Sequence, residues 1–340
     1  MNKIFEPITI HGKTLRNRVV MPPMCMYAAD EKGYSSRWHE VHYETRSVGG
    51  AGLIIQEATA VEPRGRISAN DLGIWEDGHM EGLTRIVDRV HAHGAKMGIQ
   101  LGHAGRKSLV SNEDVISPSP LCYDTGDSKY SLPREMTDKD IRAVLEAFRS
   151  GAFRAASCGY DLIEIHAAHG YLLSEFLSPL VNHRTDAYGG REGGTKFLGE
   201  IIRAVREVWS GPLQVRVSAK DFAPGGNEPE DLAGVINSVR DSGVDSVNVS
   251  SGNVVPVPLD AYNSDQIPFA DTIRKETGLP VIAGGMLSDP LECNDIVASG
   301  KADMVFLGRA HLRTPYWTLD AAHVLGETID YLPRQYKRGW

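Results

Sequence analysis

Short apolar runs alternate with amphipathic stretches along the whole chain of 340 residues. The runs predict eight strands, at residues 18–21, 52–56, 96–101, 161–166, 213–217, 246–249, 280–283 and 304–307. The stretches between them have helical spacing, as in the stripe formed by Met80, Leu83, Val87 and Val90. Strands that alternate with helices indicate parallel pairing with right-handed crossovers.

Further signals mark where the helices begin. A second apolar stripe consists of Ile141, Val144, Leu145, Phe148 and Ala152. Thr137 and Asp140 precede it with the spacing of a capping box. Asp289 follows Ser288 and precedes Pro290, a residue suited to the first turn of a helix.

Eight strand–helix units in one chain favour a single (β/α)8 TIM barrel that spans residues 1–340. No linker divides the sequence, and no Gly-x-Gly-x-x-Gly follows the first strand, which disfavours an open doubly wound sheet. A barrel places its active site at the carboxyl ends of the strands.

Composition narrows the class of protein. The hydrophobic share of 41%, the charged share of 24% and the net charge of −8 are those of a globular protein without a nucleic-acid or anionic-membrane partner. Cys25, Cys122, Cys158 and Cys293 form no Cys-x-x-Cys pair, so the sequence contains neither an iron–sulfur cluster nor a zinc ribbon motif. No apolar run has the length of a signal peptide core or a membrane span, and we expect a cytoplasmic protein.

The fourth strand delivers the strongest chemical signal. His166 stands at its end, and a turn at Gly170 brings His169 and Tyr171 beside it. Two imidazoles and a phenol can bind an oxyanion and deliver a proton. A metal site is the alternative; it needs a third ligand, and Glu164 shares a strand face with His166.

The last two strands end in glycines. Gly284-Gly285 and Gly308-Arg309 occupy the positions at which TIM barrels bind phosphate, where Arg309 could add a bidentate contact. Arg216 interrupts an apolar strand, so it either pairs with Glu57 or Glu164 or stabilises a ring that gains negative charge, such as a reduced flavin.

These motifs resemble the Old Yellow Enzyme family, specifically its bacterial thermophilic-like (YqjM-type) class. The resemblance extends from end to end of the chain. Its motifs are Phe5-Glu-Pro-Ile, Leu15-Arg-Asn-Arg18, Pro23-Met-Cys25-Met-Tyr27, Asp71-Leu-Gly-Ile-Trp75, Gly98-Ile-Gln-Leu101, His103-Ala-Gly-Arg-Lys107, His166-Ala-Ala-His-Gly-Tyr171, Asn182-His-Arg-Thr-Asp186 and Arg338-Gly-Trp340.

The resemblance implies an enzyme with tightly bound FMN that takes hydride from NADPH or NADH. It would reduce the C=C bond of α,β-unsaturated carbonyl compounds (enones, enals, maleimides, also quinones) by a ping-pong mechanism. The residues that would surround the flavin ring are Pro23, Met24, Cys25, Ala58, Gln100 and Arg216. Those that would hold the phosphate are Gly285, Gly308 and Arg309.

On the substrate side, the resemblance implies that His166 and His169 bind the carbonyl oxygen with Tyr27 nearby, and that Tyr171 donates the proton. Cys25 would tune the flavin. The tail, residues 333–340, would dock on a neighbouring subunit of a homodimer or homotetramer and contribute Arg338 to its active site.

The segment 191–196 departs from the family pattern at the start of the helix after strand four, and the loops 111–130 and 254–265, which match less well, would shape the substrate entrance. Two other functions fit the residues alone. One is a non-redox barrel lyase or isomerase that acts on a phosphorylated substrate. The other is a flavin- or metabolite-binding protein without catalytic activity.

Overall fold

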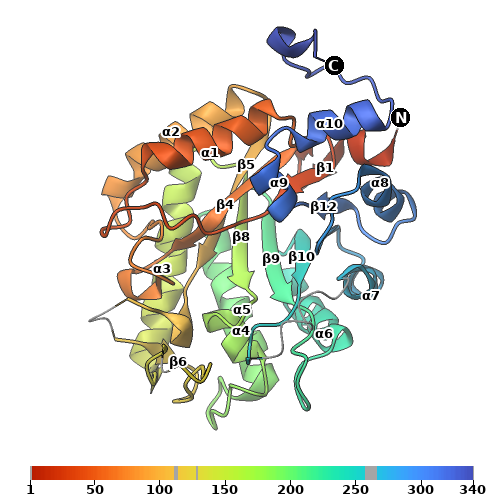
Figure 1. Cartoon of the computed structure of the whole chain (residues 1–340). Helices are drawn as coiled ribbons and strands as arrows, with labels where there is room; N and C mark the ends of the chain where they lie inside the picture. Colours follow the sequence, from red (N-terminus) through yellow and green to blue (C-terminus); the bar gives the residue numbers. More distant parts are fainter. Residues whose placement is uncertain (1, 111–113, 128, 257–265, 340) are drawn as a thin grey trace.

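The computed structural model describes residues 2–110, 114–127, 129–256 and 266–339. Its centre is a closed barrel of parallel strands (Figure 1). Each strand pairs with the next barrel strand along the chain, and the last strand, β12, pairs with the first, β3. The strands are β3 (Val19–Met21), β4 (Leu53–Ala60), β5 (Lys96–Gly102), β8 (Leu162–Ala167), β9 (Leu213–Ser218), β10 (Ser246–Ser250), β11 (Val281–Ala283) and β12 (Met304–Phe306). The predicted strands and the (β/α)8 barrel are confirmed.

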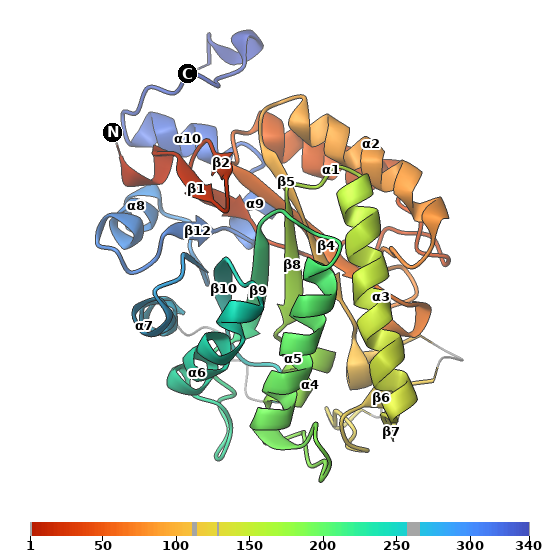
Figure 2. The same ribbon diagram turned by 180° about the vertical axis from the view of Figure 1, so that it is seen from behind.

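Helices surround the barrel, as the two opposite views show (Figures 1 and 2). The long ones are α1 (Arg37–Val48), α2 (Met80–His91), α3 (Asp138–Ser157), α5 (Gly190–Arg206), α6 (Pro229–Val239), α7 (Ile267–Thr277) and α8 (Pro290–Ala298). Shorter ones are α4 (Leu172–Leu177), α9 (Arg309–Arg313) and α10 (Trp317–Val324). The capping box of Thr137 and Asp140 and the N-cap at Asp289 are both present.

Apolar side chains form two cores. The larger lies between strands and helices and includes Leu83, Val87 and Val90 of the predicted stripe on α2. The smaller fills the barrel interior at its amino end, where Ile10 and Leu15 join Val20, Ile282 and Met304. Ile10 and Leu15 belong to an antiparallel hairpin of β1 (Ile8–Ile10) and β2 (Lys13–Leu15), which closes the amino end of the barrel.

Minor elements complete the described chain. A two-stranded sheet pairs β6 (Ile116–Ser117) with β7 (Arg134–Glu135) near the carboxyl end of the barrel. The 3₁₀ turns are η1 (Lys3–Phe5), η2 (Pro63–Gly65), η3 (Asp77–His79), η4 (Gly105–Lys107), η5 (Arg240–Ser242) and η7 (Arg334–Tyr336). No helix among the described residues is long and apolar enough to cross a membrane.

The atypical segment 191–196 lies inside α5, which begins at Gly190. Two of its glycines are required by close packing: a Cβ added at Gly193 would lie 2.0 Å from the carbonyl carbon of Tyr188, and one added at Gly194 would lie 2.1 Å from the carbonyl oxygen of Phe176. The departure from the family pattern therefore leaves this helix intact and brings it close to the preceding chain.

The tail leaves the barrel at its amino end, whereas the arrowheads of β8 and β9 point to the other end (Figure 1). The hydroxyl oxygens of Tyr316 and Tyr336 lie 3.2 Å apart and tie η7 to the body. Beyond them, Arg338 is exposed. Trp340, the loop residues 111–113 and 128, and residues 257–265 lie outside the described residues.

Candidate functional site

A cavity of about 410 Å³ opens at the carboxyl ends of β3, β9, β11 and β12. Six of the predicted cofactor residues line it: Pro23, Met24, Arg216, Gly285, Gly308 and Arg309. The other lining residues are Pro22, Ser250, Gln266, Met286, Leu287, Phe306, Ala310, Leu312 and Arg313.

The two glycine turns shape one wall of this cavity. Gly285 has a φ of +105°, a conformation that a residue with a Cβ rarely adopts. Gly308 precedes α9, and a Cβ added there would point toward the sulfur of Met24 at 3.5 Å. Arg309 extends from the same turn to the sulfur of Met286. The wall thus combines backbone amides with a guanidinium, groups that bind phosphate.

Arg216 enters the cavity from β9. Its side chain is buried, its Cζ lies 5.4 Å from the centre of the Phe306 ring, and its Nε has no hydrogen-bond partner among the described residues. No ion pair to Glu57 or Glu164 forms. Glu57 instead accepts hydrogen bonds from the Met26 amide at 2.7 Å and the Tyr43 hydroxyl at 3.0 Å. A buried donor without a partner fits a site built for a polar or anionic ligand.

Gln100 and Ala58 come from the strands beside this cavity. The Nε2 of Gln100, on β5, donates to Glu164 Oε1 at 2.7 Å. Ala58 follows an irregularity of β4 at which the register shifts between Gln56 and Ala58. That bulge turns the Glu57 side chain toward α1, where it meets Tyr43.

His166, His169 and Tyr171 converge as the sequence predicts. The His166 ring stands edge-on to both neighbours, with centroids 5.2 Å from His169 and 5.0 Å from Tyr171. His169 has a φ of +61° and is held by two serines: its amide donates to Ser218 Oγ at 2.8 Å, and its Nε2 lies 2.7 Å from Ser250 Oγ. The left-handed turn that follows β8 is thereby fixed from β9 and β10.

Burial keeps both imidazoles neutral. It lowers the pKa of His166 and of His169 well below the usual value, and the nearby charge of Arg216 acts in the same direction. His166 Nδ1 accepts the Ala168 amide at 3.3 Å, so the ring proton resides on Nε2 as a donor. If the Ser250 hydroxyl donates to Nε2 of His169, the proton of that ring resides on Nδ1.

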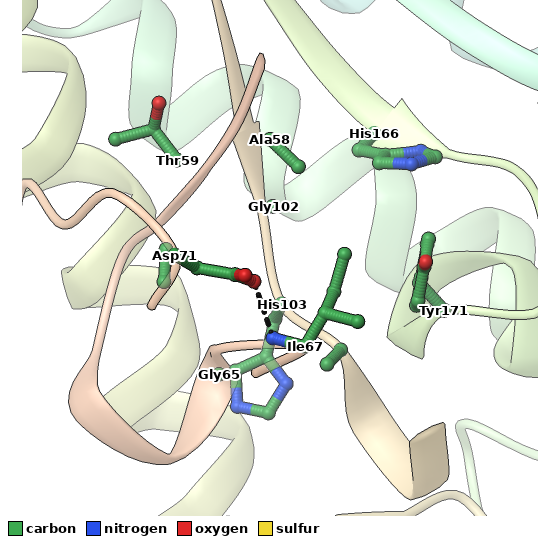
Figure 3. Close-up of a pocket in the computed structure, with 11 residues that line it drawn as sticks. Ala58, Thr59, Gly65, Ile67, Asp71, Gly102, His103, His166 and Tyr171 are labelled. Carbon is green, nitrogen blue, oxygen red and sulfur yellow. Dashed lines mark hydrogen bonds between the residues drawn. The ribbon is translucent and has the colours of Figure 1, made fainter. Parts of the chain in front are cut away.

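Tyr171 borders a second, narrow cavity of about 10 Å³, which is the size of one water molecule (Figure 3). Ala58, Asp71, His103 and His166 are among its other lining residues. Burial raises the pKa of Tyr171 well above its usual value, and the nearby carboxylate of Asp71 acts in the same direction. The phenol therefore keeps its proton until a stronger base appears.

Cys25 and Tyr27 lie on the loop that follows β3. Burial, with the negative charges of Asp71 and Glu57, raises the pKa of the Cys25 thiol well above its usual value. Tyr27 has a φ of +52°, and 56% of its surface is exposed. Partial burial of the side chain raises the pKa of its hydroxyl to about 12. Both side chains are therefore protonated at neutral pH.

The sequence assigned no role to three residues of this site, although Lys107 belongs to the motif His103-Ala-Gly-Arg-Lys107. Lys107 donates to the backbone oxygen of His169 at 3.0 Å and lies 5.2 Å from the Tyr171 ring centre. Ser218 and Ser250 hold His169 from other strands. Their position at strand ends was the available signal. Among the described residues, no group of three or more His, Cys, Asp or Glu side chains is arranged to hold a metal ion.

Comparison with known proteins links this geometry to a family. Residues 3–327 match the model of the NADH:flavin oxidoreductase / NADH oxidase family. The chain is 51% identical over 339 residues to an NADPH dehydrogenase of Geobacillus thermodenitrificans (strain NG80-2), covering 99% of this chain and 98% of the relative. It is 48% identical over 341 residues to an NADPH dehydrogenase of Halalkalibacterium halodurans, covering 100% and 99%.

Solved structures agree with the sequence relatives. Morphinone reductase superposes with a TM-score of 0.81 at 27% identity, covering 97% of this chain and 91% of that one. An old yellow enzyme homologue from Zymomonas mobilis gives a TM-score of 0.82 at 27% identity, covering 96% and 94%.

Proposed function

The chain belongs to the NADH:flavin oxidoreductase / NADH oxidase family, and we propose that it is an FMN-dependent NADPH dehydrogenase of the Old Yellow Enzyme type that reduces electron-poor alkenes. The observation that carries this proposal is the combination of the 410 Å³ cavity with the triad His166, His169 and Tyr171 beside it. One wall suits a phosphate, and the rim offers oxygen-binding donors. The interior offers the Arg216 guanidinium, whose Nε has no hydrogen-bond partner in the part of the chain that the structure describes.

The residues present fit FMN. The turns at Gly285 and Gly308 with Arg309 would hold its phosphate, and Pro23, Met24 and Arg216 would contact the ring system. The pyrimidine part of the ring carries carbonyl oxygens, which match the free Nε of Arg216. Bound FMN supplies hydride chemistry: it accepts a hydride from NADPH and gives one to the alkene.

The protein side chains prepare the alkene. Nε2–H of His166 and a ring N–H of His169 bind the carbonyl oxygen of an α,β-unsaturated aldehyde, ketone or imide. These hydrogen bonds draw electron density toward oxygen and make the β-carbon a hydride acceptor. The half-exposed Tyr27 stands at the entrance and contacts the rest of the substrate.

Tyr171 completes the reduction. As hydride reaches the β-carbon, the α-carbon gains electron density and becomes the base that takes the phenolic proton. The raised pKa of Tyr171 keeps this proton in place before the reaction. The narrow cavity beside Tyr171 has room for a water molecule that can return a proton afterwards.

The position of the C-terminal tail favours an active site that is shared between two subunits. The C-terminal tail leaves the barrel at its amino end, away from the cavity (Figure 1), and Arg338 in this tail is exposed, with no hydrogen bond or ion pair to any described residue of its own chain. An arginine placed there suits the substrate entrance of a second subunit. The protein would then act as a homodimer or a larger oligomer, with Arg338 helping to bind the substrate of its neighbour.

A non-redox lyase or isomerase is not favoured, because the family relationship is to flavin oxidoreductases over nearly the whole chain. A binding protein without activity is disfavoured by the intact triad. The test is anaerobic titration of the purified protein with NADPH and, separately, NADH, followed by reoxidation with enones, maleimides and quinones. Loss of the flavin absorbance with NADPH and its return with an enone is the expected result. Protein that holds no flavin after incubation with FMN would contradict the proposal.

A further inference from the structure

Beneath the cavity, Glu164 occupies the barrel interior with no exposure to solvent. It lies on β8 two residues before His166, so both side chains point inward. Its carboxylate accepts hydrogen bonds from Gln100 Nε2 at 2.7 Å, Asn248 Nδ2 at 2.7 Å and Gln214 Nε2. These amides come from β5, β10 and β9, so one carboxylate joins three other strands of the barrel.

The ionised carboxylate is the form that this arrangement stabilises. Both oxygens receive N–H donors, Oε1 from Gln100 and Oε2 from Gln214 and Asn248. Burial raises the pKa of Glu164, while the charge of Arg216 and the three amide donors oppose that rise. An ionised group so deep in a protein persists only where charge and donors of this kind compensate it.

Glu164 fixes which way the Gln100 amide faces. A carboxylate accepts hydrogen bonds and does not donate them, so it selects the NH₂ end of the amide. The Oε1 of Gln100 is then left as an acceptor on the side away from Glu164. The imide N–H of the flavin pyrimidine is a donor, and it matches an acceptor at this place.

Glu164 also offsets the charge of Arg216. The two residues lie on neighbouring strands, where Glu164 pairs in register with Gln214 and His166 with Arg216. Glu164 is the charge that most strongly favours the protonated form of Arg216. Because no carboxylate in the described part of the chain forms an ion pair with Arg216, its positive charge reaches the cavity, reduced by the electrostatic field of Glu164.

We infer that Glu164 is a positioning residue that would set the reduction potential of bound FMN, by orienting Gln100 and by partly neutralising Arg216 at the cavity. This inference rests on the proposed function. A reduced flavin carries more negative charge than the oxidised form, so a bare Arg216 would favour reduction. The buried carboxylate of Glu164 would make the reduction potential of bound FMN more negative, so the reduced cofactor would be a stronger hydride donor.

The test is the midpoint potential of FMN bound to Glu164→Gln, measured by anaerobic dye-coupled titration. Removing the charge at nearly constant shape should shift the potential to a more positive value, speed flavin reduction by NADPH and slow its reoxidation by an enone. The matched control is Gln214→Leu, which removes a donor from the same carboxylate but leaves the charge and the cavity lining in place. Its potential should move much less.

An unchanged potential in Glu164→Gln with FMN bound would overturn the inference. If that variant holds no flavin, Glu164→Asp decides, because its shorter side chain withdraws the carboxylate from Gln100 and Arg216: a smaller positive shift of the potential supports the inference, and an unchanged potential contradicts it. Parent protein that binds no FMN would instead refute the proposed function, so the two failures are distinguishable.

Discussion

The edge of the His166 ring meets Tyr171 with centroids 5.0 Å apart and planes inclined by 76°. The group that we propose to bind the substrate oxygen and the group that we propose to donate the proton therefore stand edge to face as neighbours. In the proposed reaction, this arrangement would hold the donor to the carbonyl oxygen and the proton donor to the α-carbon at a set spacing before a substrate arrives.

Replacing Tyr171 by Phe should separate the two half-reactions. Reduction of the flavin by NADPH should keep its rate, while reduction of an enone should slow by roughly 10²–10⁴-fold, the usual contribution of a general acid. Stopped-flow absorbance measures each half separately. Tyr160→Phe is the control, since that buried hydroxyl bonds to Gln56 and lies outside both cavities.

The contact between Ser250 and His169 predicts that removing the imidazole reduces activity more than removing the serine hydroxyl. His169→Ala should reduce enone turnover by about 10²–10³-fold and weaken the binding of phenolic ligands, because one oxygen-binding donor is gone. Ser250→Ala keeps the imidazole but frees its Nε2, so it should cost less. Spectral titration with a phenol and steady-state kinetics provide the measurements. Equal losses of enone turnover in the two variants would contradict this prediction. They would show that the orientation of the His169 ring limits the rate, and not the presence of its N–H donor.

Cys25 should react slowly as a nucleophile at neutral pH. Burial, with the charges of Asp71 and Glu57, raises its pKa well above the usual value, so the thiolate is scarce. Mass spectrometry after iodoacetamide treatment at pH 7.5 should show slow labelling of Cys25, and Glu57→Gln should accelerate it. Labelling of the parent protein as fast as a free thiol would refute this explanation.

The buried carboxyl of Glu175 should make stability depend on pH. It accepts the Arg106 amide at 2.9 Å and the Ser117 hydroxyl at 2.7 Å, and burial raises its pKa to about 7. A carboxyl with a raised folded-state pKa contributes stability at low pH and loses it as the pH rises from about 4.5 to about 7.

Glu175→Gln has no proton to lose; its amide oxygen can accept the Arg106 amide, and its NH₂ can donate to Ser117 Oγ. The unfolding free energy of this variant relative to the parent should therefore rise between pH 5 and pH 8, by up to roughly 3 kcal/mol. Urea unfolding at both pH values measures it. A difference that stays constant or falls with pH would contradict the assignment.

Removing the C-terminal tail after Pro333 should weaken substrate binding in a neighbouring subunit. A chain ending at Pro333, and Arg338→Ala in the full chain, should both raise KM for the alkene with little change in flavin reduction by NADPH. Arg334→Ala, another tail arginine, is the matched control. Light scattering reports subunit association in parallel. Unchanged KM and association in the truncated chain would exclude a shared site.

The sequence predicted those parts of the fold that have a local signal. Apolar runs located every barrel strand, and one strand end located His166, His169 and Tyr171. The β4 strand extends to Ala60, beyond the predicted residue 56, because the bulge at Glu57 breaks the alternation of inward and outward side chains. A periodic pattern does not reveal such an inserted residue.

Contacts between distant segments were beyond sequence reasoning. Arg216 had two candidate partners, and the structure gives it neither as an ion pair: Glu57 faces α1, and Glu164 is taken by three amides. Ser250 reaches His169 across 81 positions of sequence. The hairpin at Ile8–Ile10 and Lys13–Leu15 consists of strands too short to stand out by periodicity.

That hairpin has a kinetic consequence. With Ile10 and Leu15 filling the floor of the barrel, reactants approach the cavity from the carboxyl end. In the function proposed above, NADPH and the alkene would reach the cavity through one entrance, and the oxidised nicotinamide would leave before the alkene binds. We therefore expect each reactant in excess to inhibit turnover with the other, as steady-state kinetics at high NADPH would show.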